Sequence, residues 1–184
     1  MSAKDKVRRL SLVQASLPVL DSLEADVFLL GLSSENIPLK GMAGWCDWRL
    51  NGRLSGLLRN HTFECGQEET LLMDSNGFFK TMRLILFGMG ESDFMDSRSF
   101  RQMVRRMLVV AKKAKLNRVV IEPPGMLSGS VPVAEALRVS LEVMRKAHPK
   151  AWLTVVFADG ESLVAAKKVT NSIKDIQVVD YPGA

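Results

Sequence analysis

The chain has 184 residues, of which 47% are hydrophobic and 24% charged, and its formal net charge is +5. This length fits one domain with a real core, because such a chain buries roughly 70% of the surface that its unfolded form exposes. The basic excess is too small for a dedicated nucleic-acid binder, and no apolar run approaches the ~18 residues of a membrane span. Cys46 and Cys65 are the only cysteines, and no targeting segment follows Met1, so we expect a reducing, cytoplasmic location.

The apolar residues recur with two periods, which predict strands and helices in turn. Continuous apolar runs are typical of strands buried on both faces of a sheet, and three- and four-residue spacing indicates helices with one buried face. Up to residue 80, the pattern predicts a flexible basic terminus at 1–9, an edge strand at 10–15, a central strand at 27–32, one helix over 42–59 and a hairpin of strands at 61–65 and 69–74.

The clearest unit spans residues 82–124, where two apolar runs flank a long amphipathic segment. Asp96 can cap the intervening helix, and Pro123-Pro124 ends the second run. A pair of parallel strands joined by a helix requires helices on both faces of its sheet. The predicted elements of this half are strands at 83–87 and 118–121 with the helix between them, a helix to about 147, a strand at 152–157, a helix from 159 and a strand at 176–179.

These elements together predict the fold class. We expect a three-layer α/β/α domain whose mixed, mostly parallel sheet has about six strands. Residues 10–184 are predicted to form this single domain, since neither a linker nor an internal repeat interrupts them.

Four short motifs occur in a characteristic order between residues 24 and 124. They are Ala25-Asp26, Asp47 with Gly52-Arg53-Leu54, Gly88-Met89-Gly90 after a strand, and Arg101 in the following helix. In this order they resemble the amino-terminal domain of the leucine aminopeptidases. That resemblance implies a fold similar to the macro domains, which bind ADP-ribose, and the segment 127–132 resembles the macro phosphate loop.

The resemblance also implies what the chain does. In the family, catalysis belongs to a separate carboxy-terminal domain with two metal ions and an Asn-Thr-Asp-Ala-Glu-Gly-Arg motif, which this sequence lacks. We therefore expect a domain standing alone, without catalytic residues, metal or cofactor, that serves assembly, regulation or binding. Its expected partner is a second copy of itself or a separate metallopeptidase subunit, and one alternative is a binder of ADP-ribose or another phosphate ligand.

The segment 125–130 is the candidate anion site. It lies after a predicted parallel strand and before a helix, where backbone amides and the helix dipole favour an anion, although a structural turn is the alternative. Its two glycines allow close approach and its two serines add hydroxyl donors. The macro resemblance further implies that Asp26 faces an adenine amino group and that Phe157 lies near the ring. The candidate ligand-binding residues are thus Asp26, Gly125, Ser128, Gly129, Ser130 and Phe157.

Arg98, Arg101, Arg105 and Lys112 share one side of the long central helix. Such a charged arc is usually a solvated face, and weak nucleic-acid binding is the alternative.

Three further features have a structural interpretation beside a functional one. Cys46, His61 and Cys65 lack the paired spacing of zinc ligands, so buried thiols and a surface imidazole are expected. The Gly88-x-Gly90 pair is expected to be a turn rather than a phosphate cradle. Trp45 and Trp48 could stack on a ligand, but their helical spacing favours packing.

Overall fold

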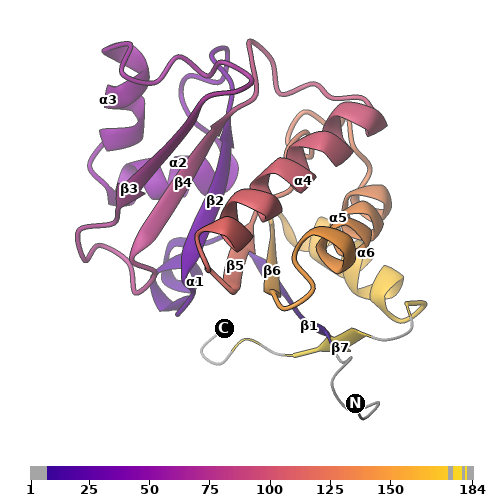
Figure 1. Ribbon diagram of the computed structural model, residues 1–184. Helices are drawn as coiled ribbons and strands as arrows, with labels where there is room; N and C mark the ends of the chain where they lie inside the picture. The colour runs from indigo at the N-terminus through magenta and orange to yellow at the C-terminus, as the bar shows by residue number, and fades with distance from the viewer. Residues whose placement is uncertain (1–7, 174–175, 180, 182–184) are drawn as a thin grey trace.

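A computed structural model of the chain describes residues 8–173, 176–179 and 181. Its centre is one seven-stranded sheet with the order β3-β4-β2-β5-β6-β1-β7, in which every neighbouring pair is parallel except the antiparallel pair of β3 and β4 (Figure 1). The mixed, mostly parallel sheet is therefore confirmed, with seven strands instead of about six. The strands are β1 (Arg8–Gln14), β2 (Val27–Leu32), β3 (Thr70–Asp74), β4 (Arg83–Gly88), β5 (Arg118–Ile121), β6 (Trp152–Phe157) and β7 (Ile176–Val178).

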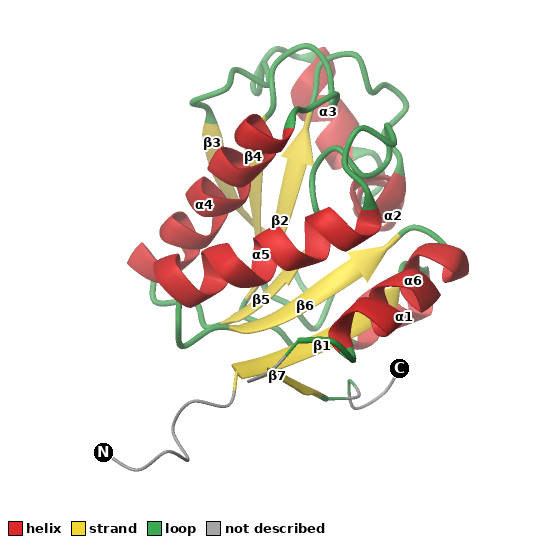
Figure 2. Ribbon diagram, turned by 90° about the vertical axis from the view of Figure 1, so that its right-hand side faces the viewer, coloured by secondary structure: helices red, strands yellow, loops and turns green. Residues whose placement is uncertain are grey.

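Helices cover both faces of the sheet, as the three-layer prediction requires (Figure 2). Phe28 and Leu30 of β2 belong to one hydrophobic cluster and Leu29 belongs to the other, because alternate residues of a strand point to opposite faces. On the face of Leu29 lie α4 (Ser97–Lys113), α5 (Val133–Ala147) and α6 (Gly160–Thr170), and on the face of Phe28 lie α1 (Leu17–Ser22), α2 (Gly41–Arg49) and α3 (Arg53–Arg59).

The strand predicted at 10–15 is not an edge strand. β1 begins at Arg8 and lies between β6 and β7, with Leu10 paired to both Leu153 and Val178. Residues 8 and 9, predicted as part of a flexible terminus, belong to β1, and residues 1–7 lie outside the described part of the chain. The short β7 that covers β1 comes from the far end of the sequence, so local alternation could not indicate it.

The helix predicted over 42–59 is two helices. Asn51 and Gly52 have φ values of 56° and 76°, in the left-handed region, where α2 ends and α3 begins. The Asp47 carboxylate accepts a hydrogen bond from the Ser55 backbone N–H at 2.9 Å, which ties the two helices together.

The predicted hairpin is also wrong. β3 pairs with β4, and the segment 61–65 is irregular, with His61 and Cys65 at positive φ. Cys65 and the following Gly66 pack closely on the end of β4, since a Cβ at Gly88 would lie 2.6 Å from the Cys65 carbonyl oxygen and 2.0 Å from that of Gly66. Gly88 is therefore a point of close backbone packing, in agreement with the structural interpretation of the Gly88-x-Gly90 pair.

Candidate functional site

The loops after β2, β4 and β5 meet at one edge of the sheet, because these three strands are parallel neighbours. We call this the carboxyl edge and define it by residues 33–40, 89–96 and 122–132. In open α/β sheets, ligands bind at this edge of the strands.

A small cavity of about 30 Å³ lies within the carboxyl edge. None of the described residues that line it is basic, whereas two are acidic. The lining includes Asn36, Asp93, Glu122, Met89, Pro123 and Leu127.

Glu122, the residue after β5, provides the acidic floor of this cavity. Its Oε2 accepts a hydrogen bond from the Met42 backbone N–H at 2.9 Å, at the start of α2. Its Oε1 is buried and has no hydrogen-bond partner within the described residues. Burial raises the pKa of Glu122 to about 7, although the Met42 hydrogen bond acts in the opposite direction. Sequence reasoning missed this group, because one Glu after a strand carries no local signal of burial.

Gly41 lets the chain pass close to the Glu122 carboxylate. A Cβ at Gly41 would lie 2.5 Å from Glu122 Oε2 and 2.6 Å from Oε1, and the residue has a φ of +57°. The glycine-containing start of α2 therefore already faces a carboxylate, in the place where a helix N-terminus would otherwise attract an external anion.

In the loop predicted to hold an anion, the serine hydroxyls form hydrogen bonds within the loop. The Ser128 hydroxyl lies 2.9 Å from the Gly125 carbonyl oxygen and 2.9 Å from Ser130 Oγ. Ser130 Oγ is also 3.1 Å from the Gly125 carbonyl oxygen and accepts from the Met95 backbone N–H at 3.0 Å. Gly129 lies in open space, since a Cβ there would meet nothing within 4 Å. The loop thus has the hydrogen bonding of a structural turn, and anion binding there stays a prediction.

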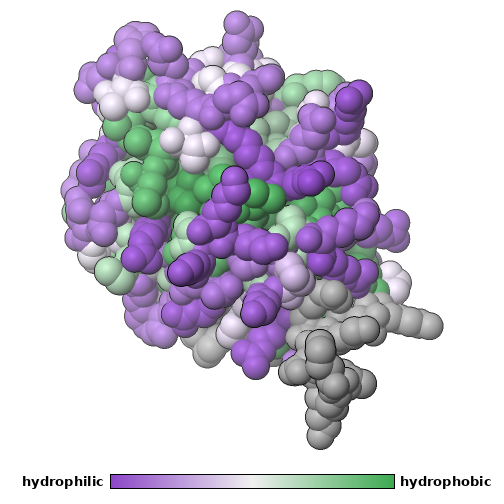
Figure 3. All heavy atoms as spheres, viewed as in Figure 1, coloured by the Kyte–Doolittle hydropathy of each residue, from purple (hydrophilic) through white to green (hydrophobic). Residues whose placement is uncertain are grey.

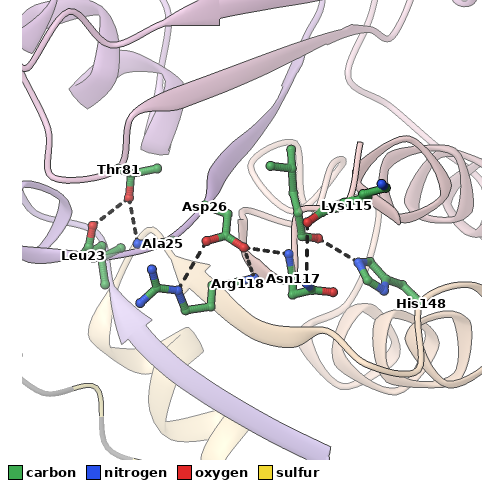
Figure 4. Close-up of polar contacts among 9 residues, drawn as sticks. Leu23, Ala25, Asp26, Thr81, Lys115, Asn117, Arg118 and His148 are labelled. Atoms are coloured by element: carbon green, nitrogen blue, oxygen red, sulfur yellow. Dashed lines mark hydrogen bonds and ion pairs between the residues drawn. The ribbon is translucent and has the colours of Figure 1, made fainter. Parts of the chain in front are cut away.

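Asp26 lies at the opposite edge of the sheet from this loop, because it precedes β2 and the loop follows the parallel strand β5. Figure 4 shows its polar contacts with Asn117 and Arg118. Its Oδ2 accepts from the backbone N–H groups of Asn117 and Arg118 at 2.7 and 2.9 Å, and its Oδ1 lies 3.4 Å from Arg118 Nε. Partial burial raises the pKa of Asp26, but the backbone hydrogen bonds from Arg118 and Asn117 outweigh it, so the pKa lies below its ordinary value. Asp26 therefore holds the start of β5 in place and is not brought together with residues 125–130.

Phe157 ends β6 and does not line the cavity either. Its side chain is fully buried and belongs to the cluster beneath α4 and α5. The macro resemblance assigned Asp26 and Phe157 to adenine. In the structure, Asp26 bonds to the backbone at the start of β5 and Phe157 is buried in the core. A residue's place at a strand end or in the core depends on pairings that motif similarity does not include.

The basic arc of α4 is partly paired. Arg101 forms an ion pair of 2.8 Å with Glu142 of α5, and hydrogen bonds from Lys146 and Arg101 lower the pKa of Glu142 to about 2. Arg98, Arg105 and Lys112 are exposed. Figure 3 shows hydrophilic side chains across this face, with apolar surface between them. The arc is a solvated face, and nucleic-acid binding through it stays a prediction.

The two tryptophans of α2 point away from the core, contrary to the packing interpretation. Met42, Ala43 and Cys46 occupy the buried side of α2, whereas Trp45 and Trp48 are 41% and 67% exposed. The positions of the buried residues around the helix could have shown that both tryptophans lie on the other side.

Both cysteines are free and buried, as predicted, and burial raises the pKa of both thiols. Within the described residues, no three His, Cys, Asp or Glu side chains are grouped so that they could hold a metal ion. Nor does any helix in the described ranges have the length and apolar character needed to cross a membrane.

The sequence profile described as "Cytosol aminopeptidase family, N-terminal domain" matches residues 28–148. The chain is 23% identical over 107 residues to a "Probable cytosol aminopeptidase" of Alkaliphilus metalliredigens, an alignment that covers 58% of this chain and 21% of that protein. The chain thus spans about a fifth of the length of this relative.

Solved structures of macrodomains share the fold. A Trypanosoma brucei macrodomain in complex with ADP-ribose superposes with a TM-score of 0.71 at 17% identity, over 91% of this chain and 72% of that one. An Oceanobacillus iheyensis macrodomain with MES bound gives a TM-score of 0.65 at 11% identity, over 83% of this chain and 86% of that one. The macro-like fold implied by the motifs is therefore confirmed.

Proposed function

Since this chain belongs to the cytosol aminopeptidase family as an N-terminal domain, we propose that it is a non-catalytic assembly module that binds a second copy of itself. The family match is confined to the N-terminal domain, and the alignment reaches only 21% of the curated relative. The free, buried thiols of Cys46 and Cys65 accord with a reducing compartment such as the cytoplasm.

The observation that carries the proposal is the exposure of Trp48. Its side chain is 67% exposed on the outer side of α2, where water contacts a large aromatic surface. Tryptophan is enriched among the residues that contribute most to protein interfaces, because burying its ring removes a large apolar area from water. Burial of the Trp48 ring by a partner would therefore stabilise the complex of the two chains.

A groove of about 530 Å³ lies directly beside this ring. The groove is lined by Trp48 itself, by the charged residues Asp47 and Arg49, and by Pro38, Leu39, Gly44, Asn51 and Gly52. A volume of this size is within the range of pockets that enclose drug-sized groups, so it has room for an indole ring. One surface thus carries both an exposed ring and a groove with room for such a ring.

A surface with both features is self-complementary. In a two-fold dimer the same patch of each subunit meets its equivalent, so Trp48 of each copy can enter the groove of the other. Other apolar side chains are exposed on α2 and on the carboxyl edge. They are Trp45 of α2 at 41%, and Ile37 at 51%, Phe94 at 73% and Leu127 at 41% on the carboxyl edge.

Sedimentation velocity over a range of concentrations tests the proposal. We expect the wild-type chain to dimerise and Trp48→Ala to weaken dimerisation by about 30-fold or more, the effect of losing an interface residue worth about 2 kcal/mol. Val164→Ala is the matched control, because Val164 is 53% exposed on α6, outside the patch. A monomeric wild type, or a dimer that Trp48→Ala leaves intact, would refute self-association through this surface.

The sheet edge is the competing interface. Leu72 of β3 is 60% exposed on the outermost strand, and unpaired strand edges can associate. If Leu72→Ser dissociates the dimer and Trp48→Ala does not, the interface lies at β3 and the proposal is wrong.

A further inference from the structure

The cavity that Glu122 lines has chemical properties that self-association does not use. It is enclosed by loops that follow β2, β4 and β5, and its polar lining consists mainly of hydrogen-bond acceptors. Among its polar groups, the Glu122 carboxylate has a buried oxygen, Oε1.

Only half of this carboxylate has a structural role. Oε2 accepts the Met42 backbone N–H at 2.9 Å, which satisfies one of the unpaired donors at the start of α2. Oε1 is buried without a partner among the described residues. A buried acceptor without a donor costs free energy, so this atom is a position where a ligand can contribute a hydrogen bond.

The charge of the cavity selects the class of ligand. Asp93 lines the same space as Glu122, Asn36 adds an amide, and no basic side chain of the described chain lines it. Two acidic groups repel phosphate and favour a cation that can donate hydrogen bonds.

The size of the cavity narrows the choice further. A volume of about 30 Å³ holds one or two groups the size of a water molecule. An ammonium group is compact and has three donors, whereas a guanidinium is a wide planar fork. The apolar walls of Met89, Pro123 and Leu127 suit the methylene carbons that carry an amine.

We propose that the carboxyl-edge cavity binds a primary ammonium group, with Glu122 Oε1 and the Asp93 carboxylate as its acceptors. Lysine side chains and free amino termini both present this group. Bound ammonium would keep Glu122 ionised, so the affinity should fall as the pH is lowered through the raised pKa of about 7. The other titratable neighbours are Asp93, on the same cavity, and Cys46 of α2, whose thiol pKa is raised by burial and then by the charge of Glu122.

NMR titration at about pH 8, above the Glu122 pKa, tests the proposal with the Met42 amide as the reporter. Nα-acetyl-lysine methylamide presents the amine as a side chain and leucinamide presents it as an amino terminus, so the tighter binder identifies the source. We expect saturable shifts of Met42 with either amine, and none with the matched alcohol, N-acetyl-6-hydroxynorleucine methylamide. Potassium chloride at equal concentration should also leave Met42 unchanged.

The variants locate the site. Glu122→Gln should weaken amine binding at least tenfold and Asp93→Asn should weaken it less, while Glu24→Gln, an exposed carboxylate at the opposite edge, should not change it. If Glu122→Gln does not fold, the wild-type titration repeated near pH 5 serves instead, and binding should be at least tenfold weaker there. Absence of saturable shifts, equal binding by Glu122→Gln, or equal binding by the alcohol would each overturn the proposal. The amine titration tests the cavity alone, and sedimentation velocity tests the dimer alone. Absence of amine binding would therefore not contradict the Trp48 dimer, and absence of a dimer would not contradict amine binding.

Discussion

The Glu122 carboxylate accepts a hydrogen bond from the Met42 backbone N–H across 2.9 Å, although the two residues are 80 positions apart in the sequence. This contact joins the end of β5 to the start of α2 and buries an acid in the middle of the carboxyl edge. The stability of the protein should therefore depend on pH in part through Glu122.

Glu122→Gln should remove the part of the pH dependence of stability that comes from Glu122. The folded-state pKa of Glu122 is raised from 4.5 to about 7, so the folded protein binds the proton more tightly than the unfolded chain does. Its contribution to stability is complete below pH 4.5 and is lost as the pH rises to about 7, a loss on the order of 3 kcal/mol at most. Urea unfolding should show Glu122→Gln gaining on wild type between about pH 4.5 and about pH 8. A constant difference between the two proteins over that range would contradict the raised pKa.

Gly41→Ala should destabilise the protein by more than about 1 kcal/mol, because alanine is strained at positive φ. Its Cβ would also lie 2.5 Å from the Glu122 carboxylate. Gly56→Ala is the matched control, since its Cβ meets nothing within 4 Å in the helix α3. That control should stabilise the fold by about 0.5–1 kcal/mol, through the higher helix propensity of alanine. Thermal or urea unfolding measures both, and equal effects would show that the approach of Gly41 to Glu122 is unimportant.

Asp26→Asn should destabilise the amino edge of the sheet by about 1–3 kcal/mol, since the backbone N–H groups of Asn117 and Arg118 lose a charged acceptor. The pKa of Asp26 is lowered in the folded state, so its contribution is present above its ordinary value of 3.8 and is lost as the pH falls below it. The gap in unfolding free energy between wild type and variant should therefore close in acid. A gap that widens below that pH would mean that Asp26 does not hold β5 as a carboxylate.

ADP-ribose should bind weakly or not at all in calorimetry. The serine hydroxyls of loop 125–130 are bonded within the loop, and two carboxylates line the neighbouring cavity. If heat is observed, Gly129→Glu should abolish it, because it adds bulk and negative charge to the loop. Gly77→Glu is the control, as Gly77 shares a positive φ and open surroundings but lies in the turn between β3 and β4. Tight binding that survives Gly129→Glu would place the ligand elsewhere.

The strands and the long helices could be predicted from the sequence alone. The apolar runs at β2, β4, β5 and β6 and the periodic spacing in α4 report burial directly, because a strand covered on both faces and a helix covered on one need those patterns. The order of short motifs was sufficient to indicate the family and hence the macro-like fold.

Only the tertiary structure decided which strand ends lie together and which helix faces are buried. Asp26 was expected to face the adenine of a ligand whose phosphates lie over the loop 125–130. It precedes β2, whereas the loop follows β5, and because these strands are parallel neighbours the two lie at opposite edges of the sheet. Trp48 was expected to pack against the rest of the protein, but the buried side of α2 is the side of Met42 and Cys46. The Glu122 carboxylate lies against Gly41, a contact that the sequence around neither residue indicates. Burial and pKa depend on contacts between distant segments, and the period of a single segment contains no information about its neighbours in space.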